Sequence, residues 1–297
     1  MNIHPLSAGL PEPLSQRTSP NNYHLLAMVT ALILQLLFPA ASIAAEYRLS
    51  MLPLFGAEEI HRRITPLAEY LSKETGLTIT PILTADFSQY SQQLSAGAIH
   101  IGYENPYVYV MHAAYHDAVA MASTGGQGFR FRGIIITRKD SPIRSIKDLK
   151  GKKIAIVSQS STGGFLSQSY SLAKQGIRLQ EDCVVEEATE NKQENVIFSV
   201  YNGDVDAGFI QEAALPQVKE FVPVESIRVL ERTEWLPNWA LSLSKKMPEA
   251  DKKKIIAAIE RLGRDAPALK AMKVDAFALT QDSEYDVVRM AAGLAKN

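Results

Sequence analysis

From Glu46 onward, segments with the pattern of β-strands alternate with segments of helical periodicity, and this alternation is the strongest constraint on the fold. The helix predicted over 57–75 has apolar residues three and four positions apart and ends before Gly76. Strands are predicted over 47–55, 77–84, 98–104, 118–123, 131–139, 152–158, 183–188, 205–211, 226–233 and 239–245. Strands that alternate with helices predict an α/β protein with parallel sheets, each covered by helices on both faces.

The alternation falls into two successive runs, which favours two lobes over one large domain. We expect the first lobe to begin over residues 46–135, the second to span 136–234, and the chain to return to the first lobe over 235–297. Two C-terminal helices, predicted over 248–263 and 283–295, then rejoin the first lobe.

The N-terminal residues 1–45 have a different composition. The segment 25–40 carries no charged residue, and small residues follow it up to Ala44 and Ala45. This pattern predicts an N-terminal extension with a signal peptide that is cleaved near those alanines on export to the periplasm. The alternative is a membrane anchor, but the run is shorter than the roughly 20 apolar residues that a span needs.

The bulk composition excludes several classes of protein. The formal net charge of −1 provides no basic face for nucleic acid, and the single Cys183 permits neither an internal disulfide nor a cysteine-built zinc site. His112 and His116 stand four residues apart, but no third ligand accompanies them, so we expect no metal and no cofactor. A lone cysteine at the start of a strand is most often a small buried apolar residue.

One turn has the chemistry of an anion site. The stretch SSTGGFL, residues 160–166, links a predicted strand to a helix. Ser161 and Thr162 supply hydroxyl donors, and Gly163 and Gly164 let a ligand approach the backbone N–H groups of a helix N-terminus. The alternative is that a serine caps the helix and nothing binds there.

Three further loops follow strands at the ends where open α/β sheets bind ligands. Asn105 and Tyr107 open one helix, Gln193 opens another, and Trp239 follows a Pro-Asn turn between the expected lobes. Each also has a purely structural explanation: capping for the polar residues, core packing for Tyr107 or Tyr109, and a plug between lobes for Trp239.

These segments together resemble the periplasmic binding proteins of phosphonate, phosphite and phosphate ABC importers, the PhnD-like family. The resemblance extends from about Tyr47 to the C-terminus and is carried by PLAEYLSKETGL, RKDSPIRSIKDLKGKKIAIV, SSTGGFL and NGDVDAG. It implies the two-lobed type II binding-protein fold, with a ligand cleft between lobes that close about a hinge. It also implies a Ser-Thr-Ser-Gly motif that holds phosphoryl oxygens, with Ser161 and Thr162 at its first two positions.

Five positions depart from the family pattern. Gly163 replaces a serine, Phe87 and Phe131 replace frequent tyrosines, Gln193 replaces a histidine, and Trp239 replaces an acid. The missing acid argues against an aminophosphonate, whose ammonium needs a carboxylate, and the missing hydroxyls argue against a buried dianion. We therefore expect a smaller, less charged or more apolar ligand in a cleft walled by the three aromatic residues.

The resemblance leaves two functions open. In the first, the protein captures a small oxyanion or organophosphorus ligand and delivers it to the permease of an ABC importer. In the second, a sensing protein of the same fold docks on the sensor domain of a membrane histidine kinase. An enzyme that uses Ser161 would need a neighbouring base, and residues 136–234 contain no histidine, so we expect no catalytic residues and no enzyme. We expect a monomer that binds no nucleic acid.

Overall fold

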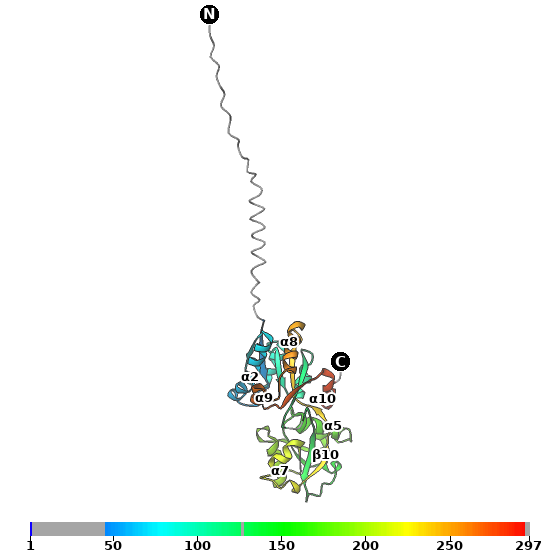
Figure 1. The fold of residues 1–297 in the computed structure, drawn as a ribbon. Coiled ribbons are helices and arrows are strands. Elements are labelled where there is room, and N and C mark those ends of the chain that lie inside the picture. Colours follow the sequence, from blue (N-terminus) through cyan, green and yellow to red (C-terminus); the bar gives the residue numbers. More distant parts are fainter. Residues whose placement is uncertain (2–44, 126–127, 295–297) are drawn as a thin grey trace. The chain divides into compact units, whose positions relative to one another are not determined.

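The structure, a computed structural model, describes Met1 and residues 45–125 and 128–294 (Figure 1). The chain divides into two units, Met1–Ala44 and Ala45–Asn297, and every element described below belongs to the second. The predicted signal peptide, with its apolar run at 25–40, lies outside the described residues and stays a prediction. Of the helices that the structure describes, none combines the length and apolar character that crossing a bilayer requires.

The first lobe is built on a six-stranded sheet with the order β13-β4-β12-β3-β1-β2. Its strands are β1 (Glu46–Met51), β2 (Thr78–Pro81), β3 (Ile101–Glu104), β4 (His116–Ser123), β12 (Ala240–Ser244) and β13 (Ala276–Leu279). β1 pairs in parallel with β2 and β3, whereas β12 is antiparallel to β3 and β4, and β13 is antiparallel to β4. The sheet is therefore mixed: the expected parallel pairing is found between β1 and its neighbours β2 and β3, and the other described pairs are antiparallel.

Helices cover both faces of this sheet. One face carries α2 (Ala57–Thr75), α8 (Glu249–Glu260) and α9 (Pro267–Met272), which lie together in Figure 1. The other face carries α3 (Phe87–Ala96), α4 (Pro106–His112) and α10 (Asp286–Ala291). α2 buries the apolar stripe predicted from the sequence, Ile60, Ile64, Leu67 and Leu71, against the sheet. This burial of one helical stripe fixes how α2 lies on the sheet.

The second lobe has a five-stranded sheet with the order β10-β6-β9-β7-β8. Its strands are β6 (Gly133–Arg138), β7 (Lys153–Ile156), β8 (Val184–Glu187), β9 (Ala207–Gln211) and β10 (Ile227–Arg232). β7 runs parallel to β8 and β9, while β6 is antiparallel to β9 and β10. This sheet is therefore also mixed.

Apolar side chains alternate between the two faces of the second sheet. Ile134 and Ile136 of β6 pack in the cluster under α7 (Gln193–Asn202), whereas Ile135 faces the cluster that includes residues of α5 (Ser167–Ala173) and α6 (Leu179–Asp182). Short turns complete both lobes: η1 (Ile146–Leu149), η2 (Thr162–Leu166), η3 (Thr189–Asn191), η4 (Glu212–Val218), η5 (Val224–Ser226) and η6 (Asp282–Tyr285). η4, which contains Pro216, is a 3-10 turn rather than an α-helix.

The chain passes between the two sheets twice, and the two passages pair. β5 (Arg130–Phe131) and β11 (Leu236–Pro237) form an antiparallel two-stranded ribbon in which Phe131 lies opposite Leu236. The lobe boundary expected between residues 135 and 136 falls inside β6, all of which belongs to the second sheet. Because β12 starts at this ribbon and runs back into the first lobe, it is antiparallel to β3 and β4.

Candidate functional site

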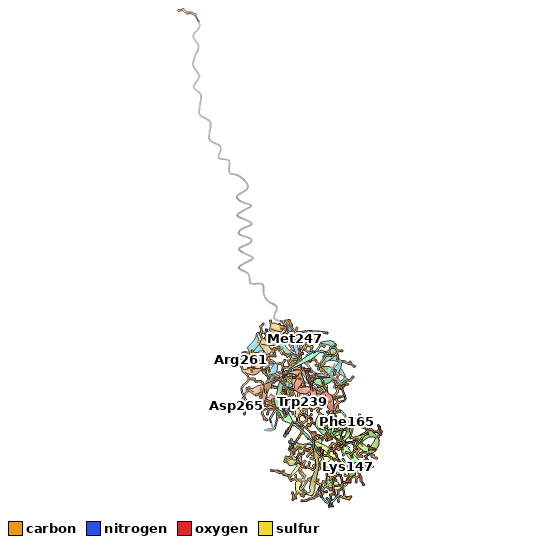
Figure 2. The ribbon with its side chains drawn as sticks, turned by 90° about the vertical axis from the view of Figure 1, so that its right-hand side faces the viewer. Lys147, Phe165, Trp239, Met247, Arg261 and Asp265 are labelled. Carbon is orange, nitrogen blue, oxygen red and sulfur yellow. The ribbon has the colours of Figure 1, made fainter. Side chains whose placement is uncertain are left out.

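A cavity of about 270 Å³ lies where the carboxyl ends of the parallel strands of both sheets face each other. Residues after β1, β2 and β3 line it from the first lobe, and residues after β7 and β8 and at the end of β9 line it from the second. Its lining is Leu54, Phe87, Asn105, Pro106, Phe131, Val157, Ser158, Ser160, Ser161, Thr162, Gly163, Asn191, Gln193, Gln211, Asn238 and Trp239. In Figure 2, Trp239 lies between Met247 of the first lobe and Phe165 of the second.

Eight of the ten predicted site residues line this single cavity: Ser161, Thr162, Gly163, Phe87, Phe131, Asn105, Gln193 and Trp239. Gly164 and Tyr107 are not among its lining residues. Sequence reasoning missed Gln211, which ends β9, and Asn238, which belongs to the Pro-Asn turn before Trp239. The rule that ligands lie at carboxyl ends of strands would have selected Gln211.

The SSTGG turn begins a helical segment whose first turn, η2, is a π-turn that continues into α5. Ser161 caps this segment, because its hydroxyl oxygen accepts the N–H of Gly164 at 3.1 Å. Thr162 is different: it is 4% exposed, it lines the cavity, and its Oγ1 has no hydrogen-bond partner among the described residues. A buried hydroxyl without a partner is costly, so this atom is poised for a group that enters the cavity.

Close packing explains both glycines of the turn. A Cβ on Gly163 would lie 2.7 Å from Cε2 of Phe131, and one on Gly164 would collide with the side chain of Val157. The carbonyl of Gly163 accepts a hydrogen bond of 2.8 Å from Nε2 of Gln168, a fully buried side chain. Gln168 thus stabilises the turn through the hydrogen bond to its backbone. The ring of Phe131 leaves no room for the serine that the family pattern has at 163.

Two carboxamides face the turn with their oxygens already in use. In the first lobe, Oδ1 of Asn105 accepts the N–H of Val108 at 2.8 Å and so caps α4. In the second lobe, Oε1 of Gln193 accepts the N–H of Gln211 at 2.8 Å. These bonds fix the orientation of both amides, and their NH2 groups are the parts left for the cavity.

The aromatic wall comes from three elements. Phe87 is the first residue of α3, Phe131 belongs to the β5 strand of the ribbon, and Trp239 directly precedes β12. Trp239 is partly buried, and its ring centroid lies 5.1 Å from that of Tyr103. The aromatic wall therefore packs against the core of the first lobe through Trp239 and belongs to the ribbon between the lobes through Phe131.

The two tyrosines of α4 have structural surroundings. Tyr109 is fully buried, its hydroxyl donates to Asp282 at 2.6 Å, and it accepts the N–H of Ala118. Tyr107 packs at the margin of the same apolar cluster. The contacts of Tyr107 and Tyr109 are therefore those of residues that pack in the core of the first lobe.

A buried polar network lies just below the first-lobe side of the cavity. Glu104, the residue before Asn105, is 1% exposed and accepts the hydroxyl of Tyr90 at 2.6 Å. Burial raises the pKa of Glu104 to about 7, against the opposing effect of hydrogen bonds from Ser242 and Tyr90. Ser242 also contacts Nδ1 of His116 at 3.0 Å, and burial lowers the pKa of that imidazole to about 4.

Metal ligands are not gathered anywhere in the described part of the chain. α4 ends at His112 and His116 begins β4, so the four-residue spacing does not place the two imidazoles on one helical face. No group of three or more His, Cys, Asp or Glu residues that could hold a metal occurs among the described residues. Cys183 is half-buried rather than buried, and its thiol donates to the carbonyl of Leu149.

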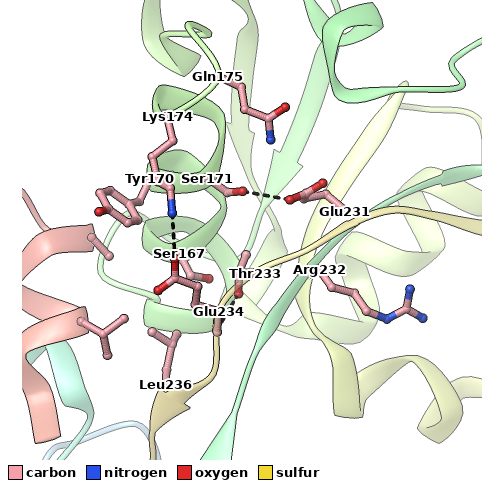
Figure 3. A pocket seen from close by; sticks show the side chains of 12 residues that line it. Ser167, Tyr170, Ser171, Lys174, Gln175, Glu231, Arg232, Thr233, Glu234 and Leu236 are labelled. Carbon is pink, nitrogen blue, oxygen red and sulfur yellow. Dashed lines mark hydrogen bonds and ion pairs between the residues drawn. The ribbon is translucent and has the colours of Figure 1, made fainter.

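A second cavity, of about 330 Å³, lies on another side of the ribbon, between α5, the segment from β10 to β11, and α10 (Figure 3). Its lining is charged. Lys174 of α5 contacts Glu234 at 2.7 Å, and the hydroxyl of Ser171 donates to Glu231 at 3.2 Å. Lys174 and Glu234 are thus paired with each other, and Arg232 pairs with Glu212 outside this cavity, whereas the hydroxyl of Thr162 in the first cavity has no partner among the described residues.

Comparison with known proteins bears on the fold and the family. The sequence family described as "ABC transporter, phosphonate, periplasmic substrate-binding protein" matches residues 49–285. The structure of PhnD1 from Prochlorococcus marinus in complex with methylphosphonate superposes with a TM-score of 0.65 at 14% identity, over 84% of this chain and 97% of that one. The predicted α/β, two-lobed type II binding-protein fold is thereby confirmed.

Two curated proteins are similar over part of their length. The phosphate-import protein PhnD of Mycolicibacterium smegmatis is 24% identical over 172 residues, which are 54% of this chain and 53% of that protein. The tetrathionate sensor histidine kinase TtrS of Salmonella typhimurium is 26% identical over 145 residues, 47% of this chain and 24% of the kinase. The chain therefore spans about half the length of the first relative and about a quarter of the second.

Proposed function

Since the chain belongs to the family of periplasmic substrate-binding proteins of phosphonate ABC transporters, we propose that it captures a small phosphonate-class oxyanion and delivers it to an importer. The family is one of binding proteins rather than enzymes, which agrees with the prediction of a binding module. The proposed place of action is the periplasm, reached through the signal peptide predicted at residues 1–45. The proposed partners are the anion and the permease of the importer.

One observation carries the proposal: the unpartnered hydroxyl of Thr162. Its Oγ1 is buried, lines the cavity and stands at the first turn of a helical segment, where backbone N–H groups lack intrahelical acceptors. An oxyanion at this point would accept hydrogen bonds from Thr162 and from the opposite lobe, where Asn105 presents its amide. The site would then be completed only when both lobes surround the ligand.

The mechanism we propose is closure of the lobes about the β5–β11 ribbon. The cavity takes its lining from both lobes and from Phe131, a residue of the ribbon itself. Contacts from both lobes to one ligand favour the closed arrangement by the difference in affinity between the closed and open forms. The permease would then recognise the closed form.

The direct test is a thermal-shift measurement with a panel of tetrahedral oxyanions that includes phosphate, phosphite, methylphosphonate and methanesulfonate. A ligand at about one hundred times its Kd stabilises the folded protein by roughly 2.7 kcal/mol, which raises the melting temperature measurably. Thr162→Val keeps the shape of the side chain and removes the hydroxyl, and we expect it to weaken binding by about 1.5–3 kcal/mol. Thr162→Ser keeps the hydroxyl and is the matched control. Equal affinities for both variants would place the head group elsewhere.

A second candidate function is sensing, favoured by the partial similarity to a sensor histidine kinase. Here the closed protein would dock on the sensor domain of a kinase instead of a permease. Deletion of the gene separates the two: loss of uptake of the labelled ligand supports transport, whereas intact uptake with loss of ligand-induced transcription supports sensing. Neighbouring genes for a permease and an ATPase, or for a kinase and a response regulator, give an independent answer.

A further inference from the structure

The cavity between the lobes has a polar side and an apolar side, and each belongs to one lobe. The second lobe contributes the hydroxyls of the segment 158–162 and the carboxamides of Asn191, Gln193 and Gln211. The first lobe contributes mainly apolar side chains. This apolar side consists of Leu54, Phe87, Pro106 and Trp239.

We infer that the second lobe takes the head group of a phosphonate and that the apolar side takes an uncharged alkyl or aryl substituent. The inference rests on the proposed function, because it places a phosphonate in this cavity, and it narrows the class of the substituent. The specificity-determining residues would then be those of the apolar side.

The first lobe offers few polar atoms to a ligand, because the two asparagines that it adds to the lining are largely used by the protein. Asn238 is 5% exposed; its Oδ1 accepts the N–H of Trp239 at 2.8 Å, and its Nδ2 donates to Oγ1 of Thr124 at 3.2 Å. Asn105 caps α4 with its Oδ1 and keeps its NH2 group for the cavity. A head group at Thr162 therefore finds most of its polar neighbours on the second lobe.

The apolar side extends the core of the first lobe to the cavity. Phe87 and Trp239 are partly buried, and both pack against the cluster that includes Leu52 and Val108. Leu54, which follows β1, lines the cavity and is 48% exposed. Covering such a surface with an apolar group removes it from water and is favourable, whereas covering it with a polar group is not. The apolar side therefore favours a hydrocarbon substituent.

The apolar side also lacks a partner for a positively charged substituent. Among the residues that the structure describes, no aspartate or glutamate lines the cavity. Two acids, Asp86 and Glu104, are next to first-lobe lining residues in the sequence, but both are engaged elsewhere. Asp86 accepts the N–H of Gln89 at 2.8 Å, and Glu104 accepts the hydroxyl of Tyr90 at 2.6 Å. An ammonium group here would lose its water without gaining a carboxylate.

The volume of the cavity, about 270 Å³, exceeds what a phosphonate group alone fills. A water molecule takes roughly 30 Å³ in the liquid, so this volume equals that of about nine waters. The head group takes only part of it, and a substituent of several carbon atoms fits in the rest.

The experiment compares ligands with one head group and different substituents, by titration calorimetry with the purified chain. The panel is phosphate and methyl-, ethyl-, propyl-, phenyl- and 2-aminoethylphosphonate, each at pH 5 and pH 9, so that the comparison is made for both charge states of the head group. Propyl and 2-aminoethyl groups have the same number of non-hydrogen atoms and differ in a terminal CH3 or NH3⁺, so this pair isolates the charge of the substituent.

We expect the Kd to fall by about fourfold for each CH2 added from methyl to propyl, the factor that corresponds to roughly 0.8 kcal/mol. We expect propylphosphonate to bind about tenfold or more tightly than 2-aminoethylphosphonate at both pH values. A propylphosphonate affinity no higher than that of methylphosphonate, phosphate or 2-aminoethylphosphonate would overturn the inference and leave the proposed function intact. If no ligand of the panel binds, the proposed function fails, and the inference fails with it.

The variant Leu54→Asn tests the placement of the substituent. It exchanges an exposed apolar side chain for a polar one of similar size, so we expect the affinity for propylphosphonate to fall about fivefold more than that for phosphate. The matched control is Leu279→Asn on β13 of the first lobe, which is 47% exposed and is not among the lining residues; it should leave both affinities unchanged. Equal losses for both ligands in a Leu54→Asn protein that is folded by circular dichroism would overturn this placement.

Discussion

The buried carboxyl of Glu104 makes the stability of the protein depend on pH, and the variant Glu104→Gln isolates this effect. The side chain is 1% exposed, and burial raises its pKa from 4.5 to about 7. A pKa that differs by one between the folded and unfolded protein corresponds to about 1.4 kcal/mol, so the free energy at stake is about 3 kcal/mol. The glycine at position 102 leaves room for this carboxyl, because a Cβ there would collide with the carboxyl of Glu104.

The sign of the effect follows from the direction in which burial moves the pKa. Between pH 4.5 and 7 the unfolded chain loses the proton of this carboxyl while the folded protein keeps it. The contribution of Glu104 is therefore complete below pH 4.5 and is lost as the pH rises through 7. His116 acts in the opposite sense: its pKa is lowered from 6.5 to about 4, so its contribution is complete above pH 6.5 and is lost as the pH falls through 4.

Between pH 4.5 and 6.5 the contribution of Glu104 falls with pH while that of His116 rises, so these two groups together leave the free energy of unfolding of the wild-type protein nearly constant there. Glu104→Gln removes the contribution that falls and leaves that of His116. The variant should gain stability from pH 4.5 to 6.5 and, at pH 8, exceed the wild type by about 2–3 kcal/mol, with a difference within about 1 kcal/mol at pH 4.5.

Urea denaturation at pH 4.5, 6.5 and 8, followed by tryptophan fluorescence, measures these differences. Glu220→Gln, at an exposed position of the second lobe, is the matched control and should change the free energy of unfolding equally at all three pH values. A difference between wild type and Glu104→Gln that is the same at pH 4.5 and pH 8 would refute the reasoning, because it would mean that the carboxyl titrates alike in both states.

Three further predictions concern the cavity and its support. Gly163→Ser restores the hydroxyl of the family pattern but collides with Phe131, so we expect weaker binding in calorimetry, and recovery when Phe131→Ala is added. Trp239→Asp places a carboxylate in the lining, and we expect the affinity for the best-binding oxyanion of the panel to fall at least tenfold while that for an aminoalkylphosphonate rises; no rise would mean that Trp239 does not face the ligand. Gln168→Leu leaves three buried carbonyls without their shared donor, and we expect a loss of about 2–5 kcal/mol in urea denaturation; a loss below 1 kcal/mol would show that the SSTGG turn does not depend on Gln168.

Much of the fold was predictable because it depends on local patterns. The stripe of α2 follows directly from helical spacing, and the glycines after α2, α3 and α7 end those helices in the left-handed conformation. The convergence of eight predicted site residues on one cavity follows from a rule of topology, since each of them lies at or near a loop that follows a parallel strand or in the connection between lobes. Their role in binding a ligand stays a prediction.

The remaining features depend on contacts between distant segments. β13 is a four-residue strand, Ala276–Leu279, that is defined by its pairing with β4 and has no clear pattern of its own. The sheets are mixed because β6, which follows the first passage through the ribbon, and β12, which follows the second, run antiparallel to the strands they pair with. No local pattern encodes these directions. The π-turn at Thr162 is equally non-local: it depends on Phe131, Val157 and Gln168, which come from three different segments.

The departures at Gly163 and Phe131 are one change rather than two. The ring of Phe131 occupies the space that a Cβ at 163 would need, with only 2.7 Å between them. A chain that places this ring in the ribbon must therefore give up the third hydroxyl of the motif, and the cavity exchanges one hydrogen-bond donor for apolar surface. Because a buried dianion requires many donors and an organic substituent gains from apolar surface, this exchange favours the less charged or more apolar ligand that the sequence predicts.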